Sequence, residues 1–183
     1  MLNKIQILKA MGRGDIIVTP FDEVFLSANS YNLHLNSILE VYTEFPLDPR
    51  KKNPTKSIEI PPEGIVLQPG ILYLGSTIEK TNQKIYVPEL EGRSSSARLG
   101  ISPHVDAGFG DIGFNGHWTL EITVVQPSIV YFEMGICKIM WHECTGEDAI
   151  LPEEHRYSAY GRYQNNDGVQ TSRMYLDGEQ KLR

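Results

Sequence analysis

Hydrophobic and polar residues alternate along most of this chain in short runs that proline and glycine interrupt. The clearest run is WTLEITVV, where Trp118, Leu120 and Ile122 lie on one face and Thr119 and Glu121 on the other. A period of two is typical of a strand with one buried face. The same character predicts strands in six further segments: 16–21, 31–42, 57–77, 84–90, 128–134 and 137–143.

One segment at the N-terminus has helical spacing instead. Leu2, Ile5, Leu8 and Met11 recur at intervals of three, and Gly12 ends the run. A short helix followed by many strands with frequent turn signals predicts an all-β barrel, roll or sandwich.

Two polar segments break the alternation. Segment 46–56 is rich in proline and basic residues, which predicts an exposed loop. From residue 153 onward, tyrosines lie among Arg, Asn, Gln and Gly. This tail is too polar for a core, and two interpretations stay open: a segment that orders on a ligand, and a disordered end.

Composition narrows the class of protein. A length of 183 residues fits a single domain over 1–183. The net charge of −6 argues against a nucleic-acid binder but leaves room for a nucleotide. Two cysteines without a secretory pattern predict reduced thiols and a cytoplasmic location, and no apolar stretch reaches the roughly 18 residues of a membrane span.

Candidate chemistry is concentrated in segment 91–121. Arg93 and Arg98 flank three serines, so guanidinium and hydroxyl donors could surround phosphate oxygens. A serine-rich turn before an exposed helix is the alternative. A glycine-dense stretch follows, and it contains Asp111, whose carboxylate could accept a hydrogen bond from a sugar hydroxyl. A β-hairpin with bulges is the alternative explanation of these glycines.

Glu121 is a carboxylate in an otherwise apolar strand, facing either solvent or a pocket. In a pocket, desolvation would raise its pKa and suit it to move protons. The His-x-Glu and Pro-Cys-x-x-Cys motifs of zinc deaminases are absent, and His142, Glu143 and Cys144 have only Cys137 as a further thiol. A deaminase built on this chain would therefore work without a protein-bound metal.

These residues resemble the dCTP deaminase family of the trimeric dUTPase superfamily. GRSSSARLG (92–100) is similar to the family's GRSSLARLG, and AGFGDIGFNGHWTLE (107–121) to AGFIDPGFxGHITLE. SYNLHL (30–35) resembles SYDLRL, with Asn32 and His34 in place of Asp and Arg. RYQNNDG (162–168) resembles KYQGQxG.

The resemblance implies a distorted β-barrel, jelly-roll-like subunit of a homotrimer with active sites between subunits, and segment 153–183 as a C-terminal lid. It implies hydrolysis of dCTP to dUTP and ammonia, with Mg²⁺ carried on the triphosphate. Phe109 stands where single-activity members have arginine, so the chain is closer to bifunctional members that continue to dUMP and pyrophosphate.

The resemblance also assigns residue roles. Glu121 is the acid/base, Ser94 and Arg98 hold the water and the base, and the Ala107 backbone binds the base edge. Asp111 binds the 3′-hydroxyl and, in a bifunctional enzyme, helps place the second water. The phosphates are bound by Arg93, Ser95, Arg162, Tyr163 and Asn166.

Departures from the family pattern, among them those at Asn32, Asp106 and Asn166, keep other functions open. Arg162 replaces a lysine, Asn166 a glutamine, and Asp106 a threonine beside the base pocket. The alternatives are a dUTPase alone and a nucleotide-binding regulatory or antiviral protein. Because Asp106 would lie beside the base pocket, a modified cytosine nucleotide is a further possible substrate.

Overall fold

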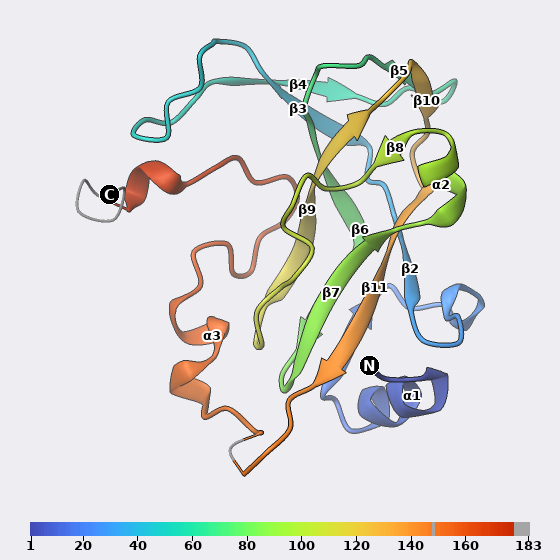
Figure 1. Cartoon of the computed structure of the whole chain (residues 1–183), viewed down its shortest axis with the longest axis vertical. Coiled ribbons are helices and arrows are strands. Elements are labelled where there is room, and N and C mark those ends of the chain that lie inside the picture. Colours follow the sequence, from blue (N-terminus) through green and yellow to red (C-terminus); the bar gives the residue numbers. More distant parts are fainter. Residues whose placement is uncertain (148, 178–183) are drawn as a thin grey trace.

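Antiparallel strands make up most of the computed structural model, which describes residues 1–147 and 149–177 (Figure 1). The strands are β1 (Ile16–Thr19), β2 (Tyr31–His34), β3 (Ile38–Tyr42), β4 (Thr55–Glu59), β5 (Ile65–Leu67), β6 (Tyr73–Gln83), β7 (Tyr86–Gly92), β8 (Ile101–Ser102), β9 (Asn115–Val124), β10 (Ser128–Val130) and β11 (Gly135–Glu143). The helices are α1 (Lys4–Gly12), α2 (Ser94–Arg98) and α3 (Tyr157–Tyr160), with 3-10 turns at η1 (Glu23–Phe25), η2 (Glu153–His155) and η3 (Met174–Leu176).

The strands form three sheets around one core. The large sheet has the order β4-β3-β6-β9-β8, with β1 also paired to β6. A second sheet has the order β2-β11-β7, and β5 pairs with β10. Leu33, Leu120, Ile139 and Trp141, from both larger sheets, are fully buried in the common core. The antiparallel sheets confirm the all-β class that the sequence pattern predicted, and they fit the distorted barrel that the resemblance implied.

Strand β9 follows the predicted alternation in its second half. Leu120 and Ile122 are fully buried, whereas Glu121 is half-buried on the opposite face. Trp118 differs from the prediction: it packs against the core but also lines a cavity on the other face. The reason is a register shift in the pairing of β6 with β9 between Ser76 and Lys80.

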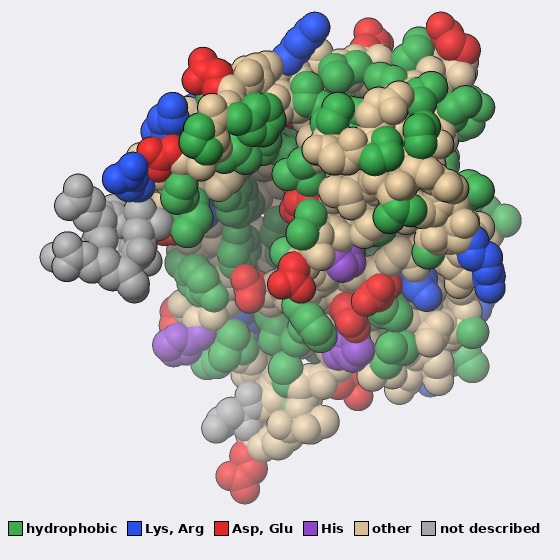
Figure 2. All heavy atoms as spheres, turned by 45° about the horizontal axis from the view of Figure 1, so that its top comes forward, with side chains coloured by type: hydrophobic (Ala, Val, Ile, Leu, Met, Phe, Trp, Pro, Cys, Tyr) green, Lys and Arg blue, Asp and Glu red, His purple; other side chains and the backbone are tan. Residues whose placement is uncertain are grey.

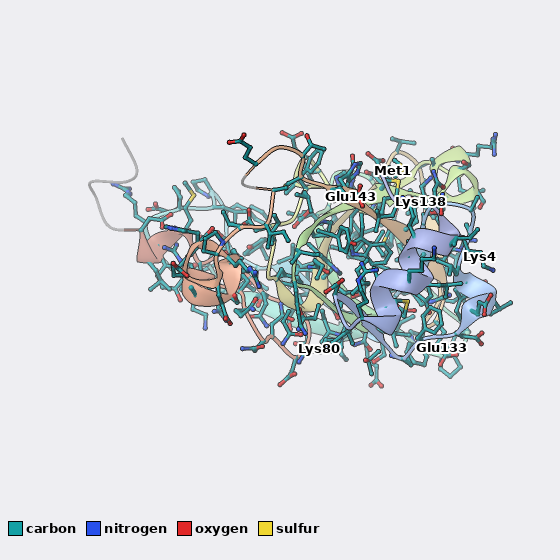
Figure 3. The ribbon with its side chains drawn as sticks, turned by 90° about the horizontal axis from the view of Figure 1, so that it is seen from below. Met1, Lys4, Lys80, Glu133, Lys138 and Glu143 are labelled. Atoms are coloured by element: carbon teal, nitrogen blue, oxygen red, sulfur yellow. The ribbon has the colours of Figure 1, made fainter. Side chains whose placement is uncertain are left out.

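Helix α1 begins at a capping box, in which Asn3 and Gln6 satisfy each other's backbone N–H groups. Its buried face differs from the predicted one, because Ile7 and Ala10 are buried whereas Ile5 is 65% exposed. Figure 3 shows the helix from below, with Lys4 on its outer side. The helices α2 and α3 are short; the serine-rich segment forms α2 itself, whereas the alternative interpretation placed a helix after it, and α3 was not predicted.

The two polar segments have different environments. The loop between β3 and β4 ends at Pro54, since Thr55 and Lys56 already pair with β3. The described part of the tail, 153–177, runs beside β9 (Figure 1) and forms hydrogen bonds with it. Residues 178–183 of the predicted lid lie outside the described residues. In the part of the chain that the structure describes, no helix is both long and apolar enough to span a membrane.

Candidate active site

A cavity of about 500 Å³ opens between β9 and the tail. Figure 2 shows this face of the molecule hollowed, with hydrophobic side chains around the recess. The lining residues are Tyr42, Leu47, Leu72, Leu74, Phe109, Gly110, Asp111, Phe114, His117, Trp118, Thr119, Glu121, Tyr157, Tyr163, Asn166, Gln170, Thr171 and Ser172.

Glu121 provides the carboxylate of this cavity. It pairs across the sheet with Leu74, which also lines the cavity. Burial among such apolar groups raises the pKa of Glu121, and the imidazole of His104 and the backbone N–H of Val105 offset this rise only in part. The side chain therefore retains a proton to higher pH than an exposed glutamate, which is the property a proton-transfer group needs.

Asp111 reaches the cavity from the glycine-rich loop before β9. The loop turns where Phe114 N–H donates to the Asp111 carbonyl and Gly113 takes a φ of 90°. At Gly110 a Cβ atom would lie 2.3 Å from the Trp118 ring, so glycine is required for the loop to pass this close. The glycines thus place an acid on the cavity wall, as the sequence suggested.

The tail closes one side of the cavity. Asn166 is 8% exposed, and its Oδ1 accepts a hydrogen bond from the His117 backbone N–H at 2.7 Å. Gln170 N–H donates to Thr119 Oγ1 at 3.0 Å. At Gly116 a Cβ atom would lie 2.7 Å from Asn166 Oδ1, so this glycine lets the tail approach β9.

Six of the predicted site residues do not line this cavity. Ser94, Ser95 and Arg98 are exposed on α2, and Ala107 is exposed on the loop. Arg93 donates from Nη1 to the Gly135 carbonyl at 2.8 Å. Arg162 forms an ion pair with Asp177, Nη2 to Oδ1 at 2.5 Å. Within one chain the structure therefore brings together only Glu121, Asp111, Tyr163 and Asn166.

Several cavity residues were missed by sequence reasoning. Tyr42, Leu72 and Gln170 come from segments with no motif, and only the fold brings them to β9. His117 did carry a signal, because it lies on the same face of β9 as Thr119 and Glu121. Among the described residues, no three His, Cys, Asp or Glu side chains gather as a metal-binding group.

The chain is similar to proteins of one family over nearly its whole length. Residues 1–144 match the model of the dCTP deaminase-like family. A Leptospira biflexa protein named dCTP deaminase, dUMP-forming, is 51% identical over 176 residues, covering 96% of this chain and 97% of its own. A Clostridium beijerinckii protein of the same name is 52% identical over 179 residues, covering 98% and 99%.

A solved structure is similar in fold. The crystal structure of 2′-deoxycytidine 5′-triphosphate deaminase from Agrobacterium tumefaciens superposes with a TM-score of 0.59 at 18% identity. The match covers 80% of this chain and 49% of that chain. At this identity the likeness concerns the fold alone.

Proposed function

This chain belongs to the dCTP deaminase-like family, and we propose that it converts dCTP to dUMP in two hydrolytic steps. The first releases ammonia and forms dUTP, and the second releases pyrophosphate. The observation that carries the proposal is Glu121, a half-buried carboxylate of raised pKa in a cavity of about 500 Å³.

In the first step Glu121 moves the proton. Its carboxylate takes a proton from a water molecule, whose oxygen attacks C4 of the cytosine. Glu121 passes this proton to N3 of the ring. It then takes the proton of the hydroxyl on C4 and gives it to the 4-amino group, so that the C4–N bond breaks, ammonia leaves and C4 becomes a carbonyl. Glu121 supplies both the base and the acid in this step, and we propose that the step uses no protein-bound metal.

The remaining groups bind the nucleotide. Asp111 accepts a hydrogen bond from the 3′-hydroxyl of the deoxyribose, and Tyr163 and Asn166 approach the phosphates from the tail. The backbone of Ala107 binds the base edge. Mg²⁺ arrives on the triphosphate as part of the substrate.

The groups on α2 complete the site from another subunit. Ser94 and Arg98, which hold the water and the base, and Ser95, which binds phosphate, are exposed and do not line the cavity of their own chain. Arg93 and Arg162 supply the remaining phosphate contacts. A symmetric trimer would place α2 of one subunit at the cavity of the next.

Exposed apolar side chains near α2 support this association. Leu99 is 55% exposed, Val125 80%, Ile129 48% and Val66 46%. Ile129 and Val66 pair across β5 and β10, and Val125 N–H donates to the Gly100 carbonyl at the end of α2. Figure 2 shows hydrophobic side chains gathered on this part of the surface. Such a patch is typical of a subunit interface.

The decisive experiment is a product assay on the purified protein with dCTP and Mg²⁺, measuring ammonia, dUTP, dUMP and pyrophosphate. Wild-type protein should release ammonia and pyrophosphate in equal amounts. Glu121→Gln should lower ammonia release by at least about 10²-fold, because the amide cannot accept the proton of the water.

Each alternative function has its own outcome in this assay. Pyrophosphate from added dUTP without ammonia from dCTP would make the protein a dUTPase alone. Binding of either nucleotide without any product would indicate a regulatory protein on the same scaffold. Turnover of 5-substituted dCTP in preference to dCTP would point to a modified nucleotide and to Asp106.

A further inference from the structure

The turn that joins the glycine-rich loop to β9 is held by hydrogen bonds from two sides. On the sheet side, the Gly113 N–H donates to the backbone carbonyl of Gln83 at 2.8 Å, and Nε2 of Gln83 donates to the Phe114 carbonyl at 3.1 Å. Gln83 is fully buried, so this side of the turn is held by a residue of the protein interior. The tail binds the other side of the turn.

Gln164 is the tail residue that holds this other side. Its Oε1 accepts from the Asn115 N–H at 2.9 Å, and its Nε2 donates to the Gly113 carbonyl at 2.8 Å. A side-chain amide has both an acceptor oxygen and donor hydrogens, so one residue can satisfy both backbone groups. The amide of Gln164 therefore bridges the turn that begins directly after Asp111.

The tail also packs closely on this turn. The Tyr157 N–H donates to the Ile112 carbonyl at 2.8 Å. A Cβ atom at Gly113 would lie 2.9 Å from Cβ of Arg156, so glycine is required for the tail to come this near. Asp111, which lines the cavity, is bonded directly to Ile112. The position of the tail therefore bears on the position of the Asp111 carboxylate.

Gln164 lies between residues that are proposed to bind phosphate. Tyr163 precedes it and Asn166 follows two positions later, and both line the cavity. Asn166 is itself bound to β9 through the His117 N–H. A triphosphate bound by Tyr163 and Asn166 would therefore hold Gln164 against the turn as well.

We propose that Gln164 is a positioning residue that couples the phosphate end of the site to its sugar end, an inference that rests on the proposed function. Its amide fixes the turn after Asp111 and so places the Asp111 carboxylate to accept a hydrogen bond from the 3′-hydroxyl. A charge-assisted hydrogen bond of this kind weakens steeply when its distance or angle departs from the optimum. Without the amide, two backbone groups of the turn lose their tail partner, and the carboxylate is held less firmly.

The test compares ammonia release from dCTP with that from dideoxycytidine triphosphate (ddCTP), which lacks the 3′-hydroxyl. For wild-type protein kcat/KM should be at least about tenfold higher with dCTP, because ddCTP leaves the Asp111 carboxylate without its partner. Gln164→Ala removes both hydrogen bonds to the turn, and in Gln164→Glu the carboxylate cannot donate to the Gly113 carbonyl. Both variants should lower the ratio of the two kcat/KM values to about threefold or less.

The matched control is Asn115→Ala. It removes the hydrogen bond from Asn115 Nδ2 to Asn165 Oδ1 at 2.6 Å, which joins the same two segments through side chains alone and leaves the backbone of the turn bound to Gln164. This control should keep the wild-type ratio. Because both nucleotides are measured on one preparation, the ratio does not depend on the fraction of protein that is folded.

Equal losses with dCTP and ddCTP in the Gln164 variants would overturn the proposal, since Gln164 would then only stabilise the fold. A lowered ratio in Asn115→Ala would overturn it too, because any contact between the two segments would then suffice. A wild-type protein that treats both nucleotides alike would refute the placement of the 3′-hydroxyl at Asp111, and this inference with it, while the deamination would stand. A wild-type protein that releases no ammonia from dCTP would instead refute the proposed function itself.

Discussion

At the scale of the residue, Glu121, the proposed acid/base, carries a cost in stability. Its neighbours Leu120 and Ile122 anchor β9 in the core, so the side chain between them is held in the apolar cavity. Burial raises the pKa of Glu121, which means that ionising it is harder in the folded chain than in the unfolded one.

This cost predicts a pH-dependent gain in stability for Glu121→Gln. The folded state retains the proton to higher pH than the unfolded state, so wild-type stability decreases as pH rises through the interval between the two pKa values. The variant has no carboxylate to ionise. It should melt at a higher temperature than wild type at neutral pH, with a difference that vanishes below about pH 4, where the wild-type side chain is protonated in both states.

Thermal unfolding at several pH values measures this difference. Glu63→Gln, at an exposed position outside the cavity, is the matched control and should change little. A Glu121→Gln difference that is the same at all pH values would contradict the role assigned to burial.

At the scale of the element, the tail is held in two places. Asn166 and Gln170 bind β9, while Arg162 and Arg173 bind each other's backbone carbonyls further out. Asp177 adds an ion pair to Arg162 and so occupies the guanidinium proposed to bind phosphate.

Asp177→Asn should therefore strengthen substrate binding. Removing a partly exposed ion pair of about 0.2–1 kcal/mol frees Arg162, which should lower KM for dCTP up to about fivefold and leave kcat unchanged. Steady-state kinetics at low salt tests this. The control is Asp167→Asn, at an exposed position in the same tail, which should leave the KM for dCTP unchanged. If Asp177→Asn leaves the KM unchanged or raises it, Arg162 does not contact the phosphates.

At the scale of the whole molecule, the proposed site is divided between two surfaces of one chain. Glu121 lies in the cavity, whereas Arg98 is exposed on α2. If α2 of one subunit completes the cavity of its neighbour, two inactive variants should complement each other.

Mixed trimers of Glu121→Gln and Arg98→Ala subunits test this. In an equal mixture each site has an even chance of an intact Glu121 and an even chance of an intact Arg98, so about a quarter of the sites should recover ammonia release. Each variant alone is the control. A mixture that forms hybrid trimers yet stays inactive would show that both residues act within one chain.

The sequence by itself determined the strands and the family to which the chain belongs. Alternation predicted β9 and the burial of Leu120 and Ile122, because a strand that covers a core must be apolar at every second position. The segment 91–121 and its resemblance identified the family, which the comparisons confirmed. These inferences succeeded because they depend on residues close together in the chain.

Only the tertiary structure decided which residues meet. The register shift between β6 and β9 lets both Trp118 and His117 line one cavity. It arises from pairing with Thr77, about 40 residues away, so the local alternation of apolar and polar residues does not reveal it. The pairing of His34 with the buried Glu79 is of the same kind. Contacts between distant segments also separate Arg98 from Glu121 and place the tail on β9. Packing in space, rather than order along the chain, brings side chains together.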